Sequence, residues 1–98
     1  MKTVSVREYE KIKIEFLHKH KDWEVETSPM DEYGRYHKTY VCEDGAVLTE
    51  VNEPTYEIAK AEVDVRGVKF QIEKEVKLFR SECWNTDNAE SIVCYEKF

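Results

Sequence analysis

Histidines and cysteines are the residues of this 98-residue chain with the chemistry to bind metal or attack a substrate. His18 and His20 lie two residues apart and point in different directions on a helix, whereas a zinc-binding pair on a helix needs a spacing of four. No two cysteines are spaced as C-x-x-C, and His37 and Cys42 meet only if the fold brings them together. The sequence therefore predicts no metal site and no cofactor.

Nucleophilic catalysis has no local signature in this chain. Three cysteines and three histidines allow many Cys–His pairs, and 21 acidic residues make chance carboxylate pairs expected. The three glycines lie too far apart for a phosphate-binding loop. We therefore predict that the protein is not an enzyme. The alternative is a thiolate at Cys42 or Cys83, which requires a lowered thiol pKa.

A run of acidic residues is the clearest functional signal. Five acids lie between Asp22 and Tyr33, and no basic residue occurs after Lys21 until Arg35. On a strand, residues two apart share a face at roughly 6–7 Å, which predicts one row of negative charge on the segment from Asp22 to Thr27. Such a row can dock on a Lys/Arg-rich groove, including one that normally holds a nucleic-acid backbone. The alternative is a solubilising face or a charge-protected edge strand.

Tyrosines follow the acidic run at Tyr33, Tyr36 and Tyr40. A tyrosine ring has a large apolar body and a polar tip, which suits protein interfaces, although the same rings can simply cover one side of a sheet. Together the two features predict a partner-binding surface made of Asp22, Glu24, Glu26, Asp31, Glu32, Tyr33 and Tyr36.

Composition restricts the partner and the compartment. The net charge of −6 argues against direct nucleic-acid binding, which needs a basic footprint, and permits a protein partner with a basic surface. No run of about 18 apolar residues is present to span a membrane, and the N-terminal stretch is charged where a signal peptide is apolar. Three cysteines without a close pair indicate reduced thiols, at least two of them in or near the core. We expect a cytoplasmic protein.

One single domain over residues 1–98 must position these side chains. Its first element is predicted to be a helix, because Ser5 followed by Glu8 fits a capping box. An apolar stripe then recurs at spacings of three and four. The stripe consists of Val6, Tyr9, Ile12 and Phe16.

Alternating apolar and polar residues predict strands after the helix. Asp44-Gly45 is a strong hairpin signal. We expect the strand that follows it to be interrupted at residues 52–54. The predicted strands are Asp22–Thr27, Arg35–Glu43 and Ala46–Val51.

The segment Tyr56–Phe79 predicts a long hairpin turning at Arg66-Gly67. That turn pairs Val65 with Val68, Val63 with Phe70 and Ala61 with Ile72 on one apolar face. The opposite face then pairs Asp64 with Lys69 and Lys60 with Glu73, so that opposite charges lie in register.

The last predicted strand is Ser91–Phe98, after a polar turn at Asn85–Asn88. Ile92, Cys94 and Phe98 fall on one of its sides, and the strand can pair with the region Val76–Trp84. The sum is an α+β fold, with one N-terminal amphipathic helix on a mainly antiparallel sheet of about five to six strands.

In size, charge and compactness the chain resembles the small acidic inhibitors that phages carry, such as anti-CRISPR proteins. The absence of a catalytic signature and the acidic and aromatic stretch Asp22–Tyr40 predict a non-catalytic protein that occupies a partner's surface, and the resemblance suggests an inhibitor acting on a basic nucleic-acid-binding groove. Two alternatives stay open. One is a module that binds a small ligand between the helix and the sheet or at a homodimer interface, and the other is a structural subunit of a larger assembly.

Overall fold

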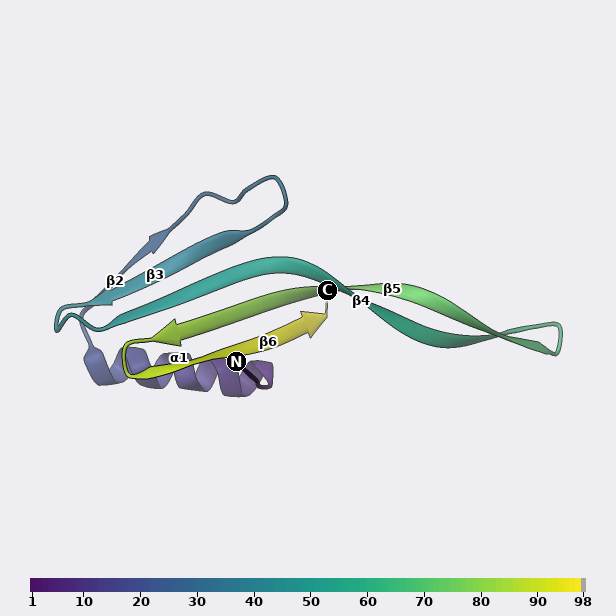
Figure 1. Ribbon diagram of the computed structural model, residues 1–98, viewed down its shortest axis with the longest axis horizontal. Helices are drawn as coiled ribbons and strands as arrows, with labels where there is room; N and C mark the ends of the chain where they lie inside the picture. Colours follow the sequence, from purple (N-terminus) through teal and green to yellow (C-terminus); the bar gives the residue numbers. More distant parts are fainter. Residues whose placement is uncertain (98) are drawn as a thin grey trace.

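The computed structural model describes residues 1–97 as one helix packed on a six-stranded sheet (Figure 1). The strand order is β1-β6-β5-β4-β3-β2, and every neighbouring pair is antiparallel except β1 with β6. This arrangement confirms the predicted α+β class. The elements are β1 (Lys2–Thr3), α1 (Val6–His20), β2 (Trp23–Thr27), β3 (Tyr36–Cys42), β4 (Val47–Val65), β5 (Val68–Asn85) and β6 (Asn88–Lys97).

Helix α1 begins and ends as its sequence predicts. The Ser5 hydroxyl accepts a hydrogen bond from the backbone N–H of Glu8 at 3.1 Å, which satisfies one of the unpaired donors of the first turn. The helix ends before Lys21, whose φ of +55° is left-handed. Tyr9 and Phe16 of the predicted stripe are buried against the sheet, and the other two members pack at the margin of this core.

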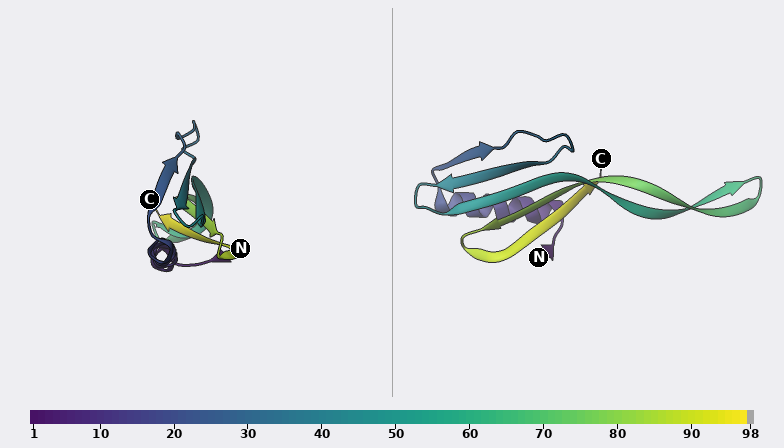
Figure 2. Two further views of the ribbon diagram at one scale, coloured as in Figure 1. Left: turned by 90° about the vertical axis from the view of Figure 1, so that its left-hand side faces the viewer. Right: turned by 45° about the horizontal axis from the view of Figure 1, so that its top comes forward.

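The core lies between α1 and one face of the sheet. The end-on view in Figure 2 shows the helix lying along that face. All three cysteines are buried and free within it, which confirms that they are core thiols. The sheet contributes residues from all of its long strands. They are Tyr40, Cys42, Leu48, Cys83, Ile92 and Cys94, and Ala46 joins them from the turn before β4.

Two polar side chains of β4 are buried beneath α1. Glu50 is 3% exposed; its carboxylate accepts hydrogen bonds from the Tyr9 hydroxyl at 2.6 Å and the Asn52 amide at 3.2 Å, and pairs with Lys13 at 3.3 Å. The Ser81 hydroxyl completes the network by donating to Asn52 at 2.8 Å. Burial alone would raise the pKa of Glu50, but the hydrogen bonds and the Lys13 charge hold it below its usual value. The carboxylate is therefore ionised and compensated.

Strand β4 runs without interruption through residues 52–54, so the predicted break there is wrong. The last residue of β4 that pairs with β3 is Asn52. Pro54 lies two residues further along β4 and pairs with Phe79 of β5. Beyond that point one side of β4 is an open edge, where a sheet tolerates a residue that has no N–H.

Strands β4 and β5 continue past the other strands as a two-stranded ribbon, here called the arm (residues 56–77). The last pair of β5 with β6 is Leu78 with Lys97, and beyond it the arm projects alone in a molecule of 65 × 28 × 18 Å (Figures 1 and 2). Arg66 and Gly67 turn the arm with φ of +52° and +79°, as a tight two-residue hairpin requires.

The predicted register of the arm is confirmed at every pair. One face, here called the apolar arm face, carries three apolar pairs; the other carries the matched charges. The apolar arm face consists of Ala61, Val63, Val65, Val68, Phe70 and Ile72.

Strand β6 pairs with β5 from Ile92–Cys83 to Lys97–Leu78, as predicted. It begins at Asn88, three residues earlier than expected, directly after a turn at residues 86–87. Ile92 and Cys94 share the core face, and Phe98 lies outside the described residues. The short parallel strand β1 was not predicted, because two residues carry no periodic signal.

Candidate functional site

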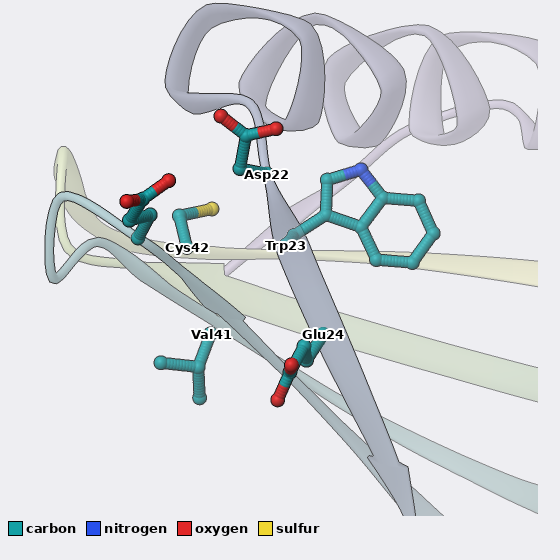
Figure 3. Close-up of a pocket in the computed structure, with 6 residues that line it drawn as sticks. Asp22, Trp23, Glu24, Val41 and Cys42 are labelled. Carbon is teal, nitrogen blue, oxygen red and sulfur yellow. The ribbon is translucent and has the colours of Figure 1, made fainter.

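In the part of the chain that the structure describes, strand β2 forms the outer edge of the sheet and pairs only with β3. All five of its residues are exposed. Glu24 pairs with Val41 and Glu26 with Thr39, which sets both carboxylates on the sheet face away from α1. Figure 3 shows Glu24 and Val41 on that side and Trp23 on the side of the helix. The predicted acidic strand is therefore an accessible edge strand.

Asp22 does not continue the row of carboxylates, so that detail of the prediction is wrong. It precedes β2 with a φ of +45° and belongs to the turn that leaves α1. Its carbonyl accepts the N–H of Glu43 at 3.1 Å, and in Figure 3 its side chain points toward the end of α1. Asp22 and Glu43 therefore place two more carboxylates at the end of β2. We call the group Asp22, Glu24, Glu26 and Glu43 the acidic edge.

An open depression of about 520 Å³ borders the acidic edge (Figure 3). Trp23 is 44% exposed and stands edge-on to Tyr40, with ring centroids 5.3 Å apart. An indole next to carboxylates suits a lysine or arginine side chain, because the ring attracts the cation and the carboxylates bind it. Sequence reasoning missed Trp23 and Glu43; strand pairing joins them to the acidic row. The lining residues are Asp22, Trp23, Glu24, Val41, Cys42 and Glu43.

Asp31 is engaged inside the loop between β2 and β3. Its carboxylate accepts the backbone N–H groups of Tyr33 and Arg35 and pairs with the Arg35 guanidinium at 2.9 Å. The backbone hydrogen bond from Arg35, with that side chain and the N–H of Tyr33, holds the pKa of Asp31 below its usual value. Asp31 thus shapes the loop, and it leaves Glu32 and Tyr33 exposed at the tip.

The predicted tyrosines do not form one surface. Tyr33 is 68% exposed, with the Arg35 guanidinium 5.2 Å from its ring centre. Tyr36 lies on the α1 side of the sheet, opposite to Glu24, where it contacts Phe79. Tyr40 is buried, with Lys13 over its ring at 5.2 Å. The structure thus groups Glu24 and Glu26 with Asp22 and separates Tyr36 from them.

A smaller cavity of about 200 Å³ lies beneath the first turns of α1. Its floor is the network of Glu50, Asn52 and Ser81, whose polar groups already bond one another and α1. Pockets for organic ligands usually measure about 300–1,000 Å³. The cavity has room for a small polar molecule only.

The environment of the thiols favours their protonated form. Burial raises the pKa of Cys83 and of Cys94 to about 11, and it also raises the pKa of Cys42. A nucleophilic cysteine needs the opposite shift. Within residues 1–97, no three histidine, cysteine or acidic side chains are grouped closely enough to hold a metal ion.

His20 joins the end of α1 to two hairpin turns, a contact that the sequence did not reveal. Its Nδ1 lies 2.6 Å from Asp44, and its Nε2 lies 2.7 Å from Asp87, which also pairs with Lys19. The hydrogen bonds to Asp87 and Asp44 raise the pKa of His20 and favour its charged form. The cluster anchors the helix and leaves the acidic edge free.

Across residues 1–97, no helix has both the length and the apolar character needed to cross a membrane. Comparison with known proteins gives no relative: no family model, no curated protein and no solved structure matches the chain.

Proposed function

We propose that this chain is a small acidic, non-catalytic binding protein that occupies the surface of a partner protein in the cytoplasm. The observation that carries the proposal is the acidic edge, where Glu24 and Glu26 lie on an exposed edge strand beside the depression at Trp23. The partner surface that fits it is rich in lysine and arginine.

The acidic edge, the Trp23 ring and the backbone of β2 have separate roles in this proposal. The carboxylates attract a basic surface over distance and speed the encounter. The half-exposed Trp23 ring is an aromatic anchor of the kind that contributes most to binding energy. The unpaired backbone of β2 can add a strand of the partner to the sheet.

A basic groove that normally holds nucleic acid is the target we favour. Its phosphate-binding side chains have the charge that Asp22, Glu24, Glu26 and Glu43 would neutralise. A protein bound there excludes the nucleic acid, as an inhibitor of the type that phages carry does.

The test is charge reversal at β2 in a tagged protein. The natural partner is captured from lysate near physiological salt and identified by mass, and the double variant Glu24→Lys/Glu26→Lys is then compared with wild type. We expect the variant to lose the partner that wild type retains, and wild type to release it at high salt. Asp31 is left unchanged, because reversing it would disrupt the loop.

A matched control uses two exposed glutamates on other elements, Glu15 of α1 and Glu90 of β6. The double variant Glu15→Lys/Glu90→Lys has the same net charge as the test variant. If both double variants lose the partner equally, net charge rather than the acidic edge governs binding. If neither loses it, the acidic edge is not the binding surface.

A second candidate function, binding of a small polar molecule, is favoured by the cavity beneath α1. Non-denaturing mass spectrometry of freshly purified protein tests it, since a retained ligand adds its mass to that of the chain. Absence of any added mass argues against this function.

A further inference from the structure

The side of β2 that faces away from β3 is an open sheet edge, along the upper margin of the sheet in Figure 1. The N–H of Glu43 donates to the carbonyl of Asp22 at 3.1 Å, and the N–H of Ser28 donates to the carbonyl of His37 at 2.9 Å. Along an antiparallel pair, residues that bond the neighbouring strand alternate with residues that face away from it. The odd-numbered residues of β2 therefore direct their N–H and C=O groups outward, and no hydrogen bond within residues 1–97 uses these groups. They are Trp23, Val25 and Thr27.

The two sheet faces beside this open edge differ in chemistry. Trp23 and Val25 pair with core residues of β3, so their side chains lie on the α1 side of the sheet, and each is 44% exposed. Glu24 and Glu26 lie exposed on the opposite face. A strand added to β2 would therefore meet apolar side chains on one face and carboxylates on the other.

A second copy of this chain does not fit the open edge. When two β2 strands pair antiparallel about Val25, Glu24 of each copy lies opposite Glu26 of the other, so acids face acids at both positions. When the pairing centres on Glu24 or on Glu26 instead, that glutamate faces its own counterpart. Like charges directly opposite each other destabilise a strand pair. The carboxylates thus keep copies of this chain apart, as charges on natural edge strands do, and they favour a foreign strand that carries lysine or arginine.

We propose that β2 binds an extended segment of a foreign protein as an additional antiparallel strand, and that it selects the sequence basic–apolar–basic. This inference rests on the proposed function and adds the form and the side-chain pattern of the partner. The backbone groups of Trp23, Val25 and Thr27 bond the added strand. Glu24 and Glu26 then occupy the positions without hydrogen bonds to that strand, where opposing side chains come closest. A lysine or arginine opposite each carboxylate forms an ion pair, and the apolar residue between them covers Val25.

The first experiment measures hydrogen exchange of the full chain with a blocked five-residue peptide, which has lysine at its second and fourth positions and valine elsewhere. In the free protein the amides of Trp23, Val25 and Thr27 should exchange fast, because no group of the described chain accepts their hydrogens. The peptide should slow all three at least tenfold and slow Glu24 less, since the N–H of Glu24 already bonds β3. A peptide of the same composition with its two lysines adjacent at one end is the control and should give no such protection.

The second experiment removes the central outward donor. Val25→Pro deletes that N–H at an edge position, where a strand tolerates proline, and Val25→Thr retains both the N–H and the branched side chain. We expect Val25→Pro to bind the alternating peptide at least tenfold more weakly than Val25→Thr, with the same circular dichroism in both variants. Where Val25→Pro alters the circular dichroism, hydrogen exchange in the wild type decides alone.

The third experiment tests the side-chain pattern by exchanging charges. Glu24→Lys/Glu26→Lys should bind the lysine peptide at least tenfold more weakly than wild type does. The same variant should bind a peptide with glutamate in place of each lysine about as tightly as wild type binds the lysine peptide. Loss of the first interaction without gain of the second would overturn the selection of a basic–apolar–basic sequence.

Wild-type amides at residues 23, 25 and 27 that stay unprotected at the highest soluble peptide concentration would overturn strand addition, as would equal binding by Val25→Pro and Val25→Thr. The proposed function fails separately. A captured partner that Glu24→Lys/Glu26→Lys loses and Val25→Pro retains would show that the carboxylates bind it without strand addition, so the proposed function would stand alone. A protected edge in a protein whose captured partner survives both variants would leave strand addition standing and overturn the proposed function.

Discussion

Strands β4 and β5 pass through two environments, the body of the sheet and the arm. In the body, Leu48 is completely buried beneath α1, and β3 and β6 flank the pair. In the arm, Val65 of the same strand is half exposed, and no strand among residues 1–97 flanks it. Alternation and charge pairing are as regular in the arm as in the body. The comparison teaches that register is a local property, whereas burial depends on neighbours distant in the sequence.

Removal of the buried carboxylate should produce the largest difference between the two regions. Glu50→Ala leaves the Tyr9 hydroxyl and the Lys13 ammonium without their partner beneath α1. Breaking a buried ion pair costs about 3 kcal/mol or more of unfolding free energy, measured by urea denaturation. Glu62→Ala is the control, because Glu62 pairs with Lys69 on the exposed face of the arm, and we expect a loss of at most about 0.5 kcal/mol. Equal losses would contradict the division into body and arm.

Two glycines of the hairpin turns, one in the body and one in the arm, allow a matched comparison of the stability lost when alanine replaces glycine at a positive φ. Gly45 of the body has a φ of +90° and Gly67 of the arm +79°, and an added Cβ has open space at both. Alanine in this conformation costs about 1 kcal/mol. We expect Gly45→Ala to lower global stability by that amount. Gly67→Ala should lower only the hydrogen-exchange protection of the arm amides, measured at low protein concentration. A global loss from Gly67→Ala would show that the arm unfolds together with the body.

The smallest effect we predict is the pH dependence from His20. Because its folded pKa is raised, its stabilising contribution is complete below the unfolded pKa of about 6.5 and is lost as the pH rises through the folded value. Asp44 and Asp87, with lowered pKa values, contribute above about pH 4 and lose that contribution on acidification. Melting temperatures across this range should fall less above pH 6.5 in His20→Gln than in wild type. A wild-type profile in His20→Gln would contradict the prediction.

Local signals predicted much of the fold correctly. The Ser5 cap fixed the start of α1, and the turn at Arg66-Gly67 fixed the register of the arm, because opposite charges and apolar residues agreed on a single pairing. Pro54 misled the prediction, since a proline at an open edge does not end a strand. The projection of the arm beyond the rest of the sheet was not predictable, because it depends on where β3 and β6 stop pairing with β4 and β5.

The candidate site was only partly visible in the sequence. Glu24 and Glu26 lie on one exposed face as alternation predicts. The turn after α1 rotates Asp22 out of that row, and the contribution of Glu43 depends on pairing between strands. The sequence contained one signal for the network around Glu50. Glu50 and Asn52 follow Leu48 at intervals of two residues, which places all three on the core face of β4.

The pairing of β1 with β6 has a consequence for synthesis of the chain. The backbone N–H of Val4 donates to the carbonyl of Val93 at 2.9 Å, and Ile92 and Cys94 complete the core against α1. The ribosome makes α1 early, but its final cover comes from the last strand in chain order. The nascent helix therefore presents Tyr9, Phe16 and Leu17 to the solvent until β6 has emerged. During that interval the growing polypeptide is exposed to chaperones and proteases, and the core closes only once β6 has left the ribosome.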